Sequence, residues 1–168
     1  MHYPLNRLRP VCKASFLGLS LPATGARLTI EEVFAAQRKT AIALRTSTAQ
    51  MRREKLRRLE DAVFAHRAAI YRALAADLRK PEAEAEHCDI LPLISGIRHA
   101  RRHLTSWMKP KRAFVPTMTM LGTKARIFYE PRGVALIIAP WNYPVSLLLG
   151  PLASAIAAGC TAILKPSE

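Results

Sequence analysis

Residues 133–168 read Gly133-Val-Ala-Leu-Ile-Ile-Ala-Pro-Trp-Asn-Tyr-Pro-Val-Ser-Leu-Leu-Leu-Gly-Pro-Leu-Ala-Ser-Ala-Ile-Ala-Ala-Gly-Cys-Thr-Ala-Ile-Leu-Lys-Pro-Ser-Glu168. The apolar run from Gly133 to Ala139 is rich in β-branched residues and is typical of a buried parallel strand. A helix is expected from Val145 to Ala158, with Gly159 as its C-terminal cap. Cys160 to Leu164 is a second short apolar strand. Strand, helix and strand in this order form a βαβ unit, so the expected fold class is α/β.

Polar side chains follow both predicted strands. The first strand leads into Pro140-Trp-Asn-Tyr-Pro and the second into Lys165-Pro-Ser-Glu. Because ligands in open α/β sheets bind outside the carboxyl ends of the strands, these two loops are the candidate site. Asn142 offers an amide, Lys165 a cation and Glu168 a carboxylate that could accept hydrogen bonds from ribose hydroxyls. No Gly-x-Gly-x-x-Gly pattern is present, which argues against an ordinary Rossmann phosphate loop.

Three helices are expected upstream of this unit. The first runs from Ile30 to Arg45 and opens on a capping box formed by Thr29 and Glu32. The second follows the breaker Thr46-Ser47-Thr48, carries an apolar stripe and continues until Pro81 stops it. The third runs from Glu86 to Met108, with Pro92 in its first turn or at a kink. Residues 109–122 are expected to be a loop, and 123–129 to be extended.

The chain of 168 residues has a formal net charge of +14, which raises the prior for an anionic partner. Basic residues concentrate between residues 37 and 80, whereas residues 133–164 contain no charged side chain. Three cysteines are too few for a disulfide framework and favour a reducing compartment, so we expect a cytoplasmic protein. No metal site is predicted. Four of the histidines, His66, His87, His99 and His103, are interpreted as surface residues.

Residues 1–29 are basic and contain no acidic side chain. This composition resembles that of a transit peptide, which keeps organelle targeting as an alternative. The preferred interpretation is a flexible leader.

A membrane-inserted protein is one alternative, because 32 uncharged residues exceed the roughly 20 that a spanning helix needs. No continuous spanning helix is expected here, because the run is broken into pieces too short to cross a membrane by Pro140, Asn142, Pro144 and Pro151.

A basic nucleic-acid-binding module is the other alternative. The segment Arg52-Arg-Glu-Lys-Leu-Arg-Arg58 could contact phosphates. No DNA- or RNA-binding motif and no aromatic stacking platform accompanies it. The preferred interpretation is a solvated helix face whose aliphatic stems cover the core.

Several ordered motifs resemble the aldehyde dehydrogenase superfamily. They are Glu130-Pro-Arg-Gly-Val-Ala-Leu-Ile-Ile-Ala-Pro-Trp-Asn-Tyr-Pro144, Gly150-Pro-Leu-Ala-Ser-Ala-Ile-Ala-Ala-Gly-Cys160 and Lys165-Pro-Ser-Glu168. The form Pro-Trp-Asn-Tyr-Pro is similar to the branch that handles fatty, aromatic and coniferyl-type aldehydes. Ala73-Leu-Ala-Ala-Asp-Leu-Arg-Lys-Pro81 and Ser106-Trp-Met-Lys-Pro110 match the N-terminal helices of that branch.

The resemblance implies roles for the matching residues. Asn142 would donate its side-chain amide to the oxyanion that forms when a thiolate attacks the aldehyde. Lys165 and Glu168 would hold the adenosine ribose of the cofactor, with Ser167 beside them. Glu168 would favour NAD over NADP, although NADP remains possible. The lining of the cofactor channel would come from Ile138, Ala139, Pro140 and Trp141.

The resemblance also implies the organisation of the chain. Residues 1–29 would be an unplaced leader and 30–168 the N-terminal part of a dehydrogenase domain, with helices at 30–108, a loop and extended segment at 109–130 and the βαβ unit at 131–168. This domain would begin with helices and continue into the start of a Rossmann-like, parallel-sheet NAD-binding domain.

The nucleophilic cysteine and general-base glutamate of the family would lie beyond Glu168. Cys160 is not interpreted as the nucleophile, because it begins a buried strand. We therefore expect the chain alone to be inactive and prone to aggregate. The full-length form would be a homodimer or homotetramer that acts on a small-molecule aldehyde, without a membrane span or a specific nucleic-acid partner.

Overall fold

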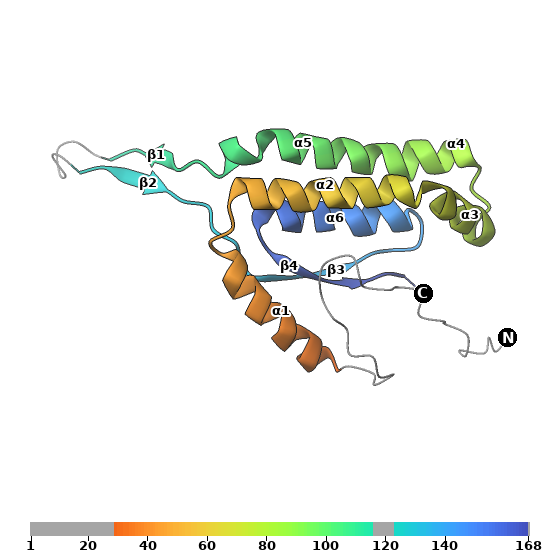
Figure 1. Cartoon of the computed structure of the whole chain (residues 1–168), viewed down its shortest axis with the longest axis horizontal. Helices are drawn as coiled ribbons and strands as arrows, with labels where there is room; N and C mark the ends of the chain where they lie inside the picture. The colour runs from red at the N-terminus through yellow and green to blue at the C-terminus, as the bar shows by residue number, and fades with distance from the viewer. Residues whose placement is uncertain (1–28, 116–122, 168) are drawn as a thin grey trace.

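The computed structural model describes residues 29–115 and 123–167 as a helical layer beside two small sheets (Figure 1). The elements, in chain order, are α1 (Ile30–Leu44), α2 (Ala49–Ala65), α3 (Arg67–Leu78), α4 (Glu82–Ala85), the π-helical turn η2 (Glu86–Ile90), α5 (Leu91–Trp107), β1 (Lys111–Ala113), β2 (Ala125–Ile127), β3 (Val134–Ile138), α6 (Pro144–Ala158) and β4 (Thr161–Lys165).

The predicted βαβ unit is confirmed. β3 and β4 pair in parallel, with a register that runs from Val134 opposite Thr161 to Ile138 opposite Lys165. Helix α6 connects them and ends at Gly159, whose φ of 80° places it in the left-handed region that glycine adopts at little cost. In Figure 1, α6 lies between the α2–α5 pair and the two strands, and it contacts all four elements. The α/β fold class is therefore confirmed.

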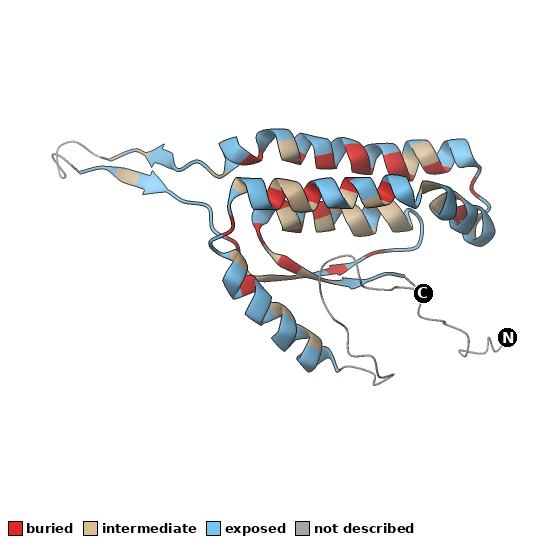
Figure 2. Cartoon of the chain, in the orientation of Figure 1, coloured by how far each residue is buried: buried red, intermediate tan, exposed pale blue. Residues whose placement is uncertain are grey.

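The hydrophobic core lies between α2, α5 and α6. Leu56 of α2 and Ile97 and Leu104 of α5 are fully buried, and Ala153 and Ala157 of α6 pack against this cluster. Figure 2 shows buried residues along both α2 and α5. Small alanines on α6 let it approach α2 and α5 closely. Burial of one such leucine or isoleucine side chain contributes about 1.5–3 kcal/mol, so this layer carries most of the hydrophobic stabilisation.

Two helices begin at side-chain caps, and the first of these is the predicted capping box. Thr29 accepts a hydrogen bond from the Glu32 N–H, and the Glu32 carboxylate accepts one from the Thr29 N–H, which completes the capping box. The next helix is capped by Thr48, whose side-chain oxygen accepts a hydrogen bond from the Met51 N–H.

The expected single helix between the Thr46-Ser47-Thr48 breaker and Pro81 is wrong. The structure divides it into α2 and α3 at His66, whose φ of −101° and ψ of 5° fall in the bridge region. The His66 N–H still donates to Ala62 O, and the Ile70 N–H donates to His66 O. The hydrogen-bonded ladder therefore turns a corner at His66 rather than ending in a loop, which explains why the apolar stripe continues across the break.

The third helix begins earlier than expected and contains a π turn. Helix starts at Glu82, immediately after Pro81, and widens at η2 before α5 begins. The Leu91 N–H donates to Glu86 O, five residues back. Pro92 follows directly and has no N–H to donate, so the wider turn falls where the normal ladder would lose a bond. Pro92 thus lies in the first turn of α5, as predicted.

Residues 111–113 form a strand where a loop was expected. β1 pairs antiparallel with β2, with Arg112 opposite Arg126, and the pair extends away from the helical layer in Figure 1. The extended conformation predicted for residues 123–129 is confirmed at β2. Lys111 and Arg112 give β1 no apolar alternation, which is why the sequence pattern did not indicate it.

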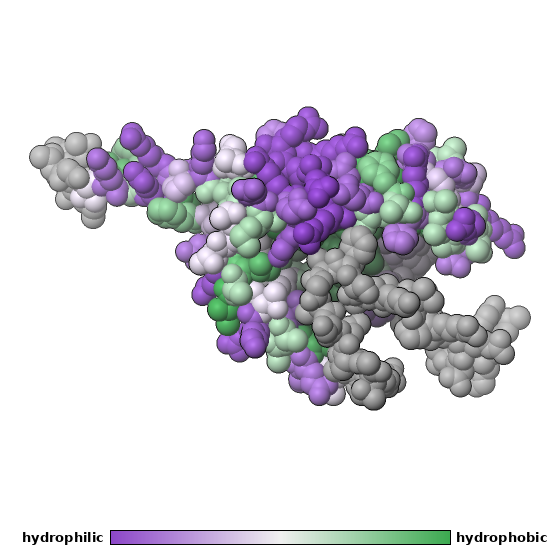
Figure 3. Space-filling model, in the orientation of Figure 1, coloured by the Kyte–Doolittle hydropathy of each residue, from purple (hydrophilic) through white to green (hydrophobic). Residues whose placement is uncertain are grey.

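The arginine-rich face of α2 is hydrophilic, as Figure 3 shows, but Arg52 is an exception to the predicted solvated face. Only 5% of Arg52 is exposed. Its Nε donates to Ser47 Oγ at 2.9 Å and its Nη1 donates to Ala157 O at 3.1 Å. Burial lowers the pKa of this guanidinium from its ordinary value. Arg52 therefore caps the carboxyl end of α6, where carbonyl oxygens lack helical partners.

Candidate functional site

The two loops predicted to form the site lie side by side. Ile138 and Lys165 are partners at the ends of β3 and β4, and the Ala139 N–H donates to Lys165 O at 3.1 Å. The parallel pairing therefore continues one residue past β3. The chain then forms the loop Pro140–Tyr143 and enters α6 at Pro144. This loop and the residues after Lys165 share one edge of the sheet, as expected for a ligand site in an α/β protein.

Most of the predicted site residues are open to solvent. Ile138 and Trp141 are 67% and 66% exposed, and Pro140, Asn142 and Lys165 are also exposed. Ala139 is buried and Ser167 is half-buried. Glu168 lies outside the described residues. The structure thus places Asn142, Trp141 and Lys165 at one accessible edge.

Two residues that the sequence did not single out bind the loop at residues 140–143 and the start of α6. Lys80 follows α3 and Asp89 lies in η2, and they form a buried ion pair with Nζ and Oδ2 3.1 Å apart. The same Nζ donates to the main-chain oxygen of Asn142 at 2.8 Å. Asp89 Oδ1 accepts from the Ser146 N–H at 3.2 Å. In the sequence, Lys80 is not distinguished from the many other basic residues, and no local pattern relates it to residue 142.

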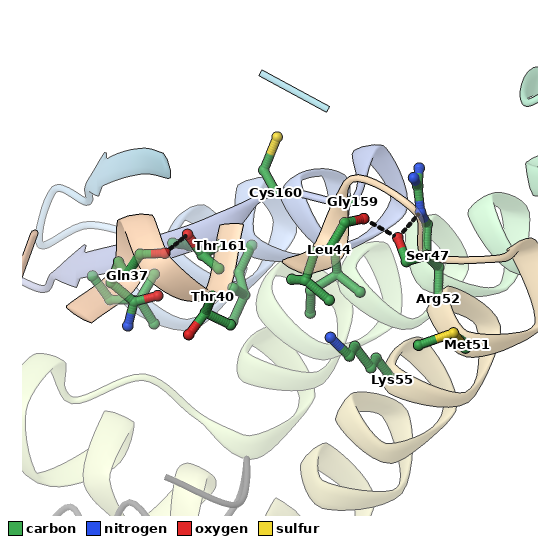
Figure 4. Close-up of a pocket in the computed structure, with 14 residues that line it drawn as sticks. Gln37, Thr40, Leu44, Ser47, Met51, Arg52, Lys55, Gly159, Cys160 and Thr161 are labelled. Atoms are coloured by element: carbon green, nitrogen blue, oxygen red, sulfur yellow. Dashed lines mark hydrogen bonds between the residues drawn. The ribbon is translucent and has the colours of Figure 1, made fainter. Parts of the chain in front are cut away.

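A separate cavity of about 340 Å³ lies between α1, α2, α6 and β4 (Figure 4). Its lining mixes apolar side chains such as Leu44 and Met51 with Thr40, Lys55 and Cys160. Thr161 Oγ1 donates to Gln37 O at 3.3 Å, which ties α1 to the start of β4. Cys160 lies just before β4 and is half-buried. The cavity is distinct from the edge that carries Asn142.

The predicted surface histidines are confirmed as exposed. One pairing was missed from the sequence: His99 and His103 are one turn apart on α5, with ring centroids separated by 4.2 Å. The Trp107 ring follows one turn later, with its centroid 5.6 Å from that of His99 and 6.0 Å from that of His103. Across residues 29–115 and 123–167, no three His, Cys, Asp or Glu side chains gather as a possible metal site.

The structure gives little support to the membrane-inserted and nucleic-acid-binding alternatives. Among the helices of the described ranges, none combines the length and apolarity needed to cross a membrane. An open hollow of about 430 Å³ on the α2–α5 face is lined by Arg53, Arg98, Arg101 and Arg102. The buried carboxylate of Glu60 already binds Arg98 and Arg101. Part of this positive surface is therefore neutralised within the protein.

The chemistry of the donors at the sheet edge fits a dinucleotide. Lys165 supplies an ammonium group and Ser167 a hydroxyl, both of which can bind ribose hydroxyls or phosphate. Trp141 presents an indole that is largely exposed and can pack against a flat ring. Asn142 adds an amide that can donate to a negatively charged oxygen.

Comparisons with known proteins identify the family. The model of the aldehyde dehydrogenase family matches residues 19–168. Among curated relatives, putative aldehyde dehydrogenase AldX of Bacillus subtilis is 43% identical over 83% of this chain and 31% of its own length. A probable coniferyl aldehyde dehydrogenase of Caulobacter vibrioides is 41% identical over 79% of this chain and 28% of its own length. The chain thus spans about 30% of these relatives.

Solved structures agree. The substrate-bound state of Staphylococcus aureus AldH is 39% identical, with a TM-score of 0.80 over 84% of this chain and 31% of that one. An Escherichia coli NADP-dependent enzyme is 26% identical, with a TM-score of 0.72 over 82% of this chain and 27% of that one. The resemblance to the coniferyl-type branch agrees with the named relatives. None of these findings supports a nucleic-acid-binding or membrane-inserted protein. The chain therefore belongs to the aldehyde dehydrogenase family, an oxidoreductase family that generally uses NAD or NADP and whose N-terminal part it matches.

Proposed function

We propose that this protein serves as the N-terminal part of an NAD(P)-dependent aldehyde dehydrogenase that oxidises an aldehyde to a carboxylic acid. The observation that carries the proposal is the convergence of two loops at one sheet edge: Asn142 follows β3, and Lys165 ends β4 opposite Ile138, the last residue of β3. One loop carries a donor suited to the reacting oxygen. The other carries groups suited to a ribose.

Asn142 is the proposed oxyanion donor. Addition of a thiolate to the aldehyde carbonyl places negative charge on the carbonyl oxygen. The Asn142 side-chain amide donates a hydrogen bond to this charge. A donor that is fixed before the charge develops lowers the barrier by about 3–4 kcal/mol. Its main-chain oxygen is bound to Lys80, which leaves the exposed side chain available at the edge.

The proposed cofactor-binding residues fall into two groups. Ile138, Ala139, Pro140 and Trp141 line the channel, while Lys165, Ser167 and Glu168 hold the adenosine ribose. The bound nicotinamide cofactor supplies the hydride acceptor. A carboxylate at Glu168 disfavours a 2′-phosphate by like-charge repulsion, so we propose a preference for NAD over NADP.

The substrate class and assembly are also proposals. Relatives named for coniferyl aldehyde and for 4,4'-diaponeurosporen-aldehyde make bulky apolar aldehydes the first class to assay. We propose a cytoplasmic protein whose active form is a homodimer or homotetramer. We propose residues 30–168 as one structural unit and residues 1–29 as a leader.

The test begins with the protein isolated from its native source. Its intact mass gives the length of the chain to be assayed. Aldehyde-dependent reduction of NAD is then measured for the wild type, for Asn142→Ala and for the isosteric Asn142→Asp, which lacks the amide donor. We expect both variants to lower kcat by about 10²–10³-fold with little change in KM. Wild-type kcat in either variant would contradict the assignment. Purified residues 1–168 should show no hydride transfer, and turnover free of host enzyme would contradict that expectation.

A further inference from the structure

Lys80 and Asp89 form a buried network that reaches the loop carrying Asn142. Lys80 is 9% exposed and Asp89 is 0% exposed. The Lys80 ammonium contacts three groups: Asp89 Oδ2 at 3.1 Å, Asn142 O at 2.8 Å and the face of the Tyr143 ring, 4.0 Å from its centroid. Two of these groups belong to the loop. One cation therefore fixes two successive loop residues.

Asp89 holds the other end of the loop. Tyr143, the residue before α6, provides no side-chain cap for the helix. Asp89 Oδ1 instead accepts the Ser146 N–H from across the structure, at 3.2 Å. A carboxylate at a helix N-terminus satisfies an unpaired N–H and complements the positive end of the helix dipole. The π turn brings this carboxylate to the start of α6, and π turns are often found at functional sites.

The network is complete within the part of the chain that the structure describes. No buried side-chain nitrogen or oxygen there lacks a hydrogen-bond partner. A buried ion pair is by itself weak grounds for stability, because well-packed apolar residues often stabilise a fold equally well. A fully satisfied polar network does, however, specify one arrangement of the groups it binds. Here those groups are the main chain of Asn142 and the first turn of α6.

We propose that Lys80 and Asp89 are positioning residues for Asn142, because they fix the main chain of residues 142–146 and so the direction in which the Asn142 amide points. The effect on catalysis rests on the proposed oxyanion role, whereas the effect on loop order does not. Oxyanion donors lower the barrier most when their position is set before the charge develops. An exposed loop held by its own turn would not meet that condition.

Glu60 provides a matched control. It is a buried carboxylate, 6% exposed, that binds Arg98 and Arg101 on the α2–α5 face. Its loss should destabilise the fold as the loss of Asp89 does, but it contacts no residue of the loop. Glu60→Gln therefore reports what general destabilisation alone does to residues 141–146.

The first experiment follows the loop in residues 1–168. Trp107→Phe leaves Trp141 as the sole tryptophan, adjacent to Asn142. Time-resolved fluorescence anisotropy of Trp141 and hydrogen exchange of the Ser146 amide are measured for Lys80→Met, Asp89→Asn, their double variant and Glu60→Gln. In Lys80→Met we expect faster local rotation of Trp141 and Ser146 exchange at least about tenfold faster. Glu60→Gln should leave both unchanged.

The double variant separates positioning from stability. Removing both charges relieves the penalty of an unpaired buried ion, so its urea midpoint should return towards that of the wild type. The loop should remain disordered, because Asn142 O still lacks its donor. Recovery of loop order together with the midpoint would overturn the proposal, as would wild-type Trp141 anisotropy in a folded Lys80→Met variant. If the single variants fail to fold, the double variant alone decides.

The second experiment uses the enzyme with the chain length found in its native source. The double variant should lower kcat about 10–100-fold, with KM for the aldehyde unchanged and the unfolding midpoint close to that of the wild type. An unchanged kcat, in an enzyme whose Asn142→Ala variant is impaired, would overturn the catalytic part. If Asn142→Ala is also without effect, the oxyanion proposal fails. The anisotropy of Trp141 then still tests whether Lys80 and Asp89 order the loop.

Discussion

The helical layer and the β3–β4 pair differ in how well their apolar side chains are covered. Leu56 and Ile97 in the helical layer have no exposed surface, whereas Leu136 and Ile138 on β3 are 64% and 67% exposed. Ile137, between them, faces the other side of the strand and is buried. The helices thus form a closed core, and the strands present one covered and one open face. Stability is concentrated in the first region, and the candidate site lies in the second.

The largest expected effect tests this contrast directly. Leu56→Ala removes a fully buried side chain and leaves a cavity, so it should lower the free energy of unfolding by about 2–5 kcal/mol. The same change at Leu136 should stay within about 0.5 kcal/mol, because that side chain is already in water. Urea unfolding followed by far-UV circular dichroism measures both. Equal losses would show that the strand face is covered in solution.

Gly159→Ala tests the junction between the two regions and should have the next largest effect. A left-handed backbone costs a non-glycine residue about 1–2 kcal/mol. A Cβ at residue 159 would also lie 2.5 Å from the Arg52 guanidinium carbon, which closes the end of α6. We expect a clear drop in the urea midpoint that is smaller when Gly159→Ala is made in an Arg52→Ala background. An equal drop in both backgrounds would mean that Arg52 can move away.

Leu136→Lys should change association more than stability. The open strand face of residues 1–168 should cause concentration-dependent self-association, and a charge on that face should reduce it. Light scattering over a dilution series measures the effect. Leu136→Val keeps the apolar surface and should associate as the wild type does. A wild-type chain that stays monomeric at every concentration would contradict this prediction.

Glu54→Gln should have the smallest effect. Hydrogen bonds from Arg57 and Arg58 lower the pKa of the Glu54 carboxyl from 4.5 to about 2. A lowered carboxyl pKa stabilises the fold above pH 4.5, and this contribution disappears as the pH falls to about 2. Because the site is exposed, solvent screening keeps the contribution small. The Tm difference between wild type and Glu54→Gln should be measurable near neutral pH and absent at the acid end. A difference that grows on acidification would reverse the assignment.

The βαβ unit was predictable because its signals are local. An uncharged run interrupted by Pro140 and Pro144 and closed by Gly159 has one simple interpretation as strand, helix and strand. Parallel pairing then brings Asn142 and Lys165 to one edge without further information. That part of the candidate site follows from chain direction alone.

Other features depend on contacts that a local pattern does not contain. Lys80 and Asn142 are 62 residues apart, and they meet where η2, which carries the Lys80 partner Asp89, packs against α6. Arg52 looked like its exposed neighbours because burial of one arginine in a basic run has no sequence signature. The corner at His66 was missed because the apolar stripe continues through it, from Val63 to Ile70.

The long-range contact of Arg52 has a consequence for folding during synthesis. Its contact with Ala157 joins residues 105 positions apart, and Ala153 and Ala157 complete the core around Leu56. A chain grows from its N-terminus at about 5–20 residues per second. Helix α6 ends 51 residues after α5, so the α2–α5 pair waits about 3–10 s with an unfinished apolar face before α6 is synthesised. During that interval the nascent chain exposes the apolar surface that α6 later covers, and such surface is prone to aggregation until it is buried.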